Sequence, residues 1–180
     1  MPIFAPPPPP PRAAIATAIQ ELPPLSFAGF RAHMPMREVR ALATAGGGSL
    51  TCMATTDPRL RECTGVMPSG NVFPPFKLLI SSVRDTAAVI VLMVNVAEKD
   101  SRGWVRALTQ DFGTPNHRTD RGVSESWQWI RKGQMLRLIQ HAADGMLETA
   151  VTLTDGPLLD ALGPPPSFRK APGPKKQMPD

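Results

Sequence analysis

The chain of 180 residues contains no tyrosine, only two cysteines and only three histidines. Without tyrosine, no phenol is available as an acid or a nucleophile. His33, His117 and His141 do not have the H-x-x-x-H or H-E-x-x-H spacing of a zinc site on a helix. The sequence has no G-x-S-x-G motif, and no lysine follows the glycine run at 46–48 as in a phosphate loop. We therefore expect no catalytic residues, no metal ligands and no cofactor.

Long hydrophobic runs are also missing. The longest, Ala87–Val94, is far shorter than the roughly 20 apolar residues that a membrane-spanning helix requires. At the start of the chain, prolines interrupt any basic region followed by an apolar one, which is the pattern of an export signal. We expect no membrane span, and no export signal within this chain.

Proline, in contrast, is abundant, with 22 residues gathered mainly at the two ends. Proline tracts favour extended polyproline II and carry few side chains that can pack, so residues 1–25 and 164–180 are predicted to be disordered. Most of the basic excess of the chain lies on the second of these segments, in Arg169, Lys170, Lys175 and Lys176. We interpret it as a solubility tail and expect no nucleic-acid binding by the folded part.

The two cysteines flank a turn sequence, Thr56-Asp57-Pro58-Arg59. A hairpin centred on Asp57 and Pro58 places Cys52 directly opposite Cys63, with Cβ atoms about 4.5–5.5 Å apart. We predict a structural disulfide, and the alternative is a pair of buried free thiols. A disulfide would place the protein in the periplasm or outside the cell, and free thiols would leave it in the cytoplasm.

Hydrophobic periodicity predicts two helices, over 36–45 and over 101–111, the second capped by Asp100 or Ser101. The four residues Val39–Leu42 recur as Val105–Leu108, each copy near a helix end. Seven strands are predicted, over 49–55, 60–67, 76–83, 87–96, 123–131, 134–141 and 146–154. The predicted fold is α+β, with short helices on one face of an antiparallel sheet. Its two tandem helix-then-meander units, 26–98 and 99–163, share one core.

Turn positions predict which side chains share a face of this sheet. Strand 87–96 is apolar on both sides, which predicts a central strand covered on both faces. In the last three strands, Trp127 and Trp129 fall beside leucines and valines, so we expect them in the core rather than on an aromatic binding platform.

The opposite face of those three strands is mixed in polarity and is the predicted site for a partner. Arg137 lies near its middle, and an exposed arginine on an open sheet is a typical protein contact. The candidate partner-binding residues are Gln128, Arg137, Ile139, His141 and Thr152.

Two stretches resemble a known fold. Phe27–Leu42 is similar to the opening F-x-x-v-x-x-G-M-t-x-x-x-V-x-x-l of the β-lactamase inhibitor proteins and of the outer-membrane assembly lipoprotein BamE, with His33 in place of the glycine. Phe112–Pro115, followed by Trp127 and Trp129, is similar to the later part of such a unit. The resemblance implies tandem α/β units, a disulfide across an early hairpin, and protein binding without catalysis. No partner-contacting residue of that group transfers to this sequence.

The expected function is therefore a non-enzymatic, extracytoplasmic module that binds another protein, as an inhibitor or adaptor, through its open sheet face. One alternative is a small enzyme whose site forms from loops 68–75 and 113–122, with His117 and Asp120. The other is a nucleic-acid-associated protein that acts through the basic tail.

Overall fold

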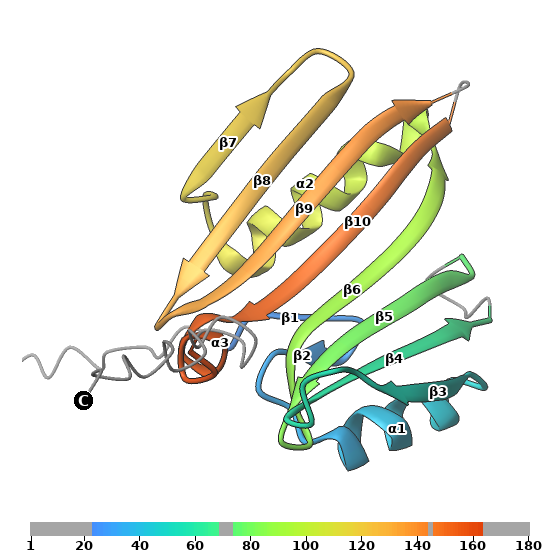
Figure 1. Cartoon of the computed structure of the whole chain (residues 1–180). Helices are drawn as coiled ribbons and strands as arrows, with labels where there is room; N and C mark the ends of the chain where they lie inside the picture. Colours follow the sequence, from blue (N-terminus) through green and yellow to red (C-terminus); the bar gives the residue numbers. More distant parts are fainter. Residues whose placement is uncertain (1–22, 69–73, 144–145, 164–180) are drawn as a thin grey trace, which may run out of the picture.

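A computed structural model describes residues 23–68, 74–143 and 146–163. Eight strands form one antiparallel sheet, a two-stranded ladder precedes it, and three helices complete the described fold (Figure 1). The elements are β1 Ser26–Phe27, β2 Phe30–Arg31, α1 Met36–Ala45, β3 Ser49–Ala54, β4 Leu60–Met67, β5 Phe76–Val83, β6 Thr86–Ala97, α2 Glu98–Phe112, β7 His117–Asp120, β8 Ser124–Arg131, β9 Gln134–Ala143, β10 Met146–Asp155 and α3 Gly156–Asp160. The predicted α+β class is confirmed. None of the helices among these residues is both long and apolar enough to cross a membrane.

The strand order of the large sheet is β3-β4-β5-β6-β10-β9-β8-β7. Its centre is the antiparallel pair of β6 and β10, which runs in register from Ala97 opposite Met146 to Val89 opposite Thr154. The predicted proline-rich ends lie almost entirely outside the described residues. Leu25, the last residue assigned to the first of them, is buried in the core.

The core lies on one face of the sheet, where the helices pack. In Figure 1, α2 passes behind β8, β9 and β10. Leu108 and Phe112 of α2 belong to the same buried cluster as Met36 and Val39 of α1, together with the inward side chains of the strands. The predicted core position of the tryptophans is confirmed, because Trp129 is 1% exposed and donates its indole N–H to the carbonyl of Gly113 at 2.8 Å.

Some predicted bounds are correct and others are wrong. The first helix has the predicted range, Met36–Ala45. The second begins earlier, at Glu98, and its N-cap is Ala97 without a side-chain cap bond, so the predicted cap by Asp100 or Ser101 is wrong. The reason is that β6 passes into α2 with no intervening loop to be capped.

Strand 87–96 is central, as predicted, but it is not covered on both faces. The side chains of Ile90 and Leu92 are buried under the helices, whereas Met93 on the other side is 41% exposed. The buried residues of α1 and α2 belong to the cluster on the first face. An apolar surface is therefore left open where the sequence pattern predicted a buried one.

The disulfide between Cys52 and Cys63 is present, with an S–S distance of 2.03 Å, and the two residues are direct partners in the β3–β4 register. Cys63 is buried, and the guanidinium of Arg40 lies 3.0 Å from the sulfur of Cys52. Structural disulfides of this kind are typical of oxidising compartments.

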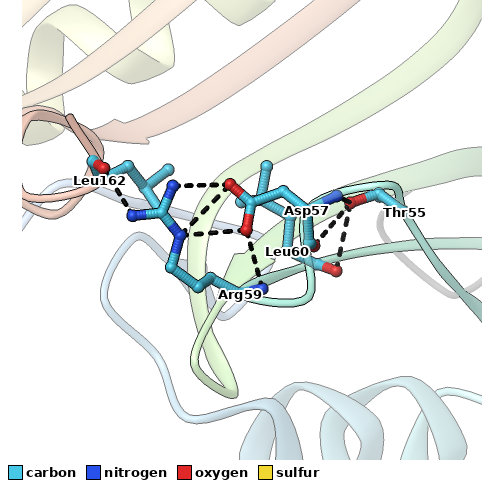
Figure 2. A network of polar contacts seen from close by, with 5 residues as sticks. All are labelled: Thr55, Asp57, Arg59, Leu60 and Leu162. Atoms are coloured by element: carbon cyan, nitrogen blue, oxygen red, sulfur yellow. Dashed lines mark hydrogen bonds and ion pairs between the residues drawn. The ribbon is translucent and has the colours of Figure 1, made fainter. Parts of the chain in front are cut away.

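A polar cluster holds the turn between β3 and β4 (Figure 2). Asp57 accepts the backbone N–H of Arg59 at 3.0 Å, and its carboxylate also accepts from the Arg59 guanidinium at 2.6 Å. The same guanidinium donates to the carbonyl of Leu162 at 2.7 Å. The paired guanidinium lowers the pKa of Asp57 to about 2. The cluster therefore ties the first hairpin to the end of the described chain and has a structural role.

Candidate binding face

The open face is the side of the sheet away from the helices, and strand registers define it continuously. Side chains on an antiparallel sheet alternate, so directly paired residues project from the same side. One unbroken row crosses the eight strands through Thr51, Thr64, Leu79, Val91, Thr152, Arg137, Gln128 and His117. Three predicted partner-binding residues, Gln128, Arg137 and Thr152, are therefore immediate neighbours.

Exposed apolar side chains concentrate on this face. Seven large hydrophobic side chains are exposed among the residues that the structure describes, and six of them lie on the open side of their strands. These are Met53, Val66, Leu79, Met93, Ile130 and Met146. Single exposed hydrophobic residues are common on protein surfaces, but their collection on one face indicates an interaction surface.

Arg137 is an isolated cation in this surface. The eight surrounding positions of the open face are all uncharged: Gln128, Thr152, Ser126, Ile139, Ala150, Ile130, Met135 and Thr154. The side chain is half-buried, and its Nε is fully buried with no hydrogen-bond partner among the described residues. A buried donor without an acceptor is costly. Because Nε itself is inaccessible, a partner would pair with the exposed part of the Arg137 side chain.

A hollow of about 520 Å³ lies next to Arg137 on the same face. It forms over Ala150, which pairs with Met93 on one side and Ile139 on the other, because alanine has no side chain beyond Cβ to fill the space between them. Val66 on β4 and Pro74 and Pro75 before β5 add apolar walls. The predicted residues Ile139 and His141 both line this hollow.

The polar part of the hollow is at one end. The next row of paired residues places Glu148 between Asn95 and His141, and all three line the hollow. Lys77 borders the side toward β5. The hollow thus combines an apolar floor with hydrogen-bonding groups at its edge, as binding sites commonly do.

The structure does not bring together the residues of the proposed enzymatic site. His117 and Asp120 lie on β7, within the segment that was predicted to be a loop. Their register partners, Gln128 and Glu125, place them on opposite faces of the sheet. The other predicted loop, 68–75, ends at β5, and four strands separate β5 from β7 in the sheet. Residues 69–73 of that loop are outside the described part. The described residues also contain no cluster that could hold a metal ion.

The sequence prediction missed the half of the face that β3 to β6 form. Met93, Val66 and Leu79 are exposed on this face but are not among the predicted contact residues. The available signal is that strand 87–96 is apolar on both sides, a pattern that predicts burial on both faces. The hollow itself depends on the pairing of β10 with β6, which no turn specifies.

Comparison of the chain with protein-family models, curated proteins and solved structures finds no match.

Proposed function

We propose that this chain is a non-enzymatic protein-binding module, inhibitor- or adaptor-like, that contacts its partner through the open face. The observation that carries the proposal is Arg137, a half-buried cation with an unsatisfied Nε, surrounded by uncharged positions on a face with many exposed apolar residues. Arginine flanked by apolar side chains is the composition of an interface centre, where one charged anchor is desolvated by its neighbours.

An extracytoplasmic location is part of the proposal. Disulfides persist in periplasmic and secreted proteins, whereas cytoplasmic reductants keep most thiols reduced. The Cys52–Cys63 bond therefore supports a periplasmic or secreted protein.

We also propose that the sheet consists of two helix-then-meander units. α1 precedes the four strands β3 to β6, and α2 precedes the four strands β7 to β10. The last strands of the two sets, β6 and β10, pair antiparallel at the centre, as two similar units related by a local two-fold axis would. This arrangement is compatible with the tandem plan that the resemblance implies.

Capture of partners from an extract of the source organism tests the function. Immobilised wild-type protein and the R137E variant are compared, with bound proteins identified by mass spectrometry. We expect R137E to weaken capture of a specific partner about tenfold or more, because it replaces the anchoring cation by an anion.

The matched control is R106E, which makes the same charge change at an exposed arginine of α2, on the helical side of the molecule. It should capture the partner as the wild type does, and both variants should keep the wild-type circular dichroism spectrum. Equal capture by R137E and wild type would show that the open face is not the binding face.

A further inference from the structure

The hollow over Ala150 is a feature that the proposed function does not by itself explain. Protein contact through a flat sheet needs no cavity, yet this face has one of about 520 Å³ at its centre. Cavities of about 300–1,000 Å³ with apolar walls and a few polar groups are typical of ligand-binding sites. Its apolar walls include Val66, Pro75, Met93 and Ile139.

We propose that this hollow receives a single aromatic side chain from the partner protein, presented beside an acidic residue that pairs with Arg137. This inference rests on the proposed function and specifies the chemistry of the partner. The aromatic group is favoured because the hollow is lined by apolar groups and includes the thioether of Met93, which makes favourable contacts with aromatic rings.

Charge complementarity assigns the acidic neighbour. Ala150, the floor of the hollow, is diagonal to Arg137 in the sheet. Ile139, which lines the hollow, lies two residues after Arg137 on the same strand. A residue next to the inserted aromatic group is therefore within reach of the guanidinium. Because no carboxylate occupies the surrounding open-face positions, a partner carboxylate would meet no competing intramolecular ion pair there.

The polar end of the hollow favours a polypeptide over a lipid-like ligand. Glu148, at this end, accepts hydrogen bonds and would repel a carboxylate or phosphate head group there, although Lys77 borders the hollow on the β5 side. Together with Asn95 and His141, it can instead pair with the backbone N–H and C=O groups of a peptide segment. The occupant that fits all of these groups is a loop of a protein.

Short peptides test the inference directly. The probe is a blocked pentapeptide with a central phenylalanine between two aspartates, and the readout is methyl NMR of Met93 and Ala150 in the full chain. We expect both methyl signals to shift, with a Kd on the order of 1 mM. Peptides with glycine in place of phenylalanine, or with lysines in place of the aspartates, should bind at least about tenfold more weakly.

The A150L variant fills the hollow without adding charge and should lose peptide binding. Its matched control is T51L, which adds a leucine on the same face of the sheet at the exposed edge strand β3, outside the hollow and away from Arg137. T51L should bind the peptide as the wild type does. A150L binding as tightly as the wild type, the glycine peptide binding as well as the phenylalanine peptide, or octanoate shifting the methyl signals when the peptide does not would each overturn the inference.

The two proposals fail separately. If R137E loses the cellular partner while A150L retains it, the open face is the binding face and the inserted aromatic group is wrong. If both variants capture the partner as the wild type does, the proposed function itself is wrong.

Discussion

At the scale of single residues, Asp57 is the group whose charge the fold perturbs most clearly. The Arg59 guanidinium and the Arg59 backbone N–H both bond its carboxylate and lower its pKa from 3.8 to about 2. A carboxyl group whose pKa is lower in the folded state stabilises the fold above its unfolded pKa, and this contribution is lost as the pH falls through the folded value.

We therefore expect the Tm difference between wild type and D57N to be largest above pH 4 and to shrink between about pH 4 and pH 2. Thermal unfolding followed by circular dichroism at several pH values measures it. The control is D160N, at an exposed aspartate of α3. A difference that stays constant across this range would show that the Arg59 pair does not contribute in this way.

His33 occupies a backbone conformation that normally favours glycine. Its φ is +66°, and the resembled motif has a glycine at this position. The side chain compensates through a contact at 2.8 Å between its Nδ1 and the buried carboxylate of Asp155, which also caps α3. Histidine is among the residues that tolerate this region better than most.

Alanine and glycine at position 33 separate the backbone strain from the contact to Asp155, because both substitutions lose that contact. H33G should be more stable than H33A by about 1 kcal/mol, because alanine is strained at a positive φ and glycine is not. Urea unfolding measures the difference. At helical position Arg106 the order should reverse, with R106A more stable than R106G. H33A equal to or more stable than H33G would contradict this interpretation.

At the scale of elements, the β3–β4 hairpin is closed by its disulfide. The bond joins residues separated by 11 positions. Closing a loop of that size removes conformations from the unfolded chain, which corresponds to about 3 kcal/mol in the loop-entropy model.

The double variant C52A/C63A should therefore lower the free energy of unfolding by about 3 kcal/mol, measured with urea. The control T51A/T64A changes the adjacent pair on the open face of the same hairpin and should cost less than about 1 kcal/mol. A thiol assay on denatured, unreduced protein should find no free thiol. Two free thiols would contradict the disulfide and remove the support for an extracytoplasmic location.

Elements with a strong local pattern were predicted well, and elements without one were not. The ranges of α1, β4 and β5 agree with the prediction because helical spacing, alternation and turn residues act over a few neighbouring positions. β7 was missed because all four of its side chains are exposed, so its sequence has no apolar alternation. The two-residue strands β1 and β2 are too short to show any period.

At the scale of the whole molecule, the open face exists because the helices pack on only one side of the sheet. The pattern of β6 could not reveal this, since an apolar side chain has the same sequence signature whether a helix covers it or a partner does. The candidate site was therefore predicted in part. The hairpin registers predicted that Gln128, Arg137 and Thr152 lie side by side. They did not predict the apolar part of the face, which β3 to β6 form.

The sequence by itself determined the first helix, the hairpins from β3 to β6 and from β8 to β10, the pairing of Cys52 with Cys63 and the burial of the two tryptophans, because each depends on contacts between residues close along the chain. Only the tertiary structure decided that β10 lies beside β6. That long-range pairing has no connecting turn, and it places Ala150 between Met93 and Ile139. The hollow, and the surface that we propose for binding, follow from that single juxtaposition.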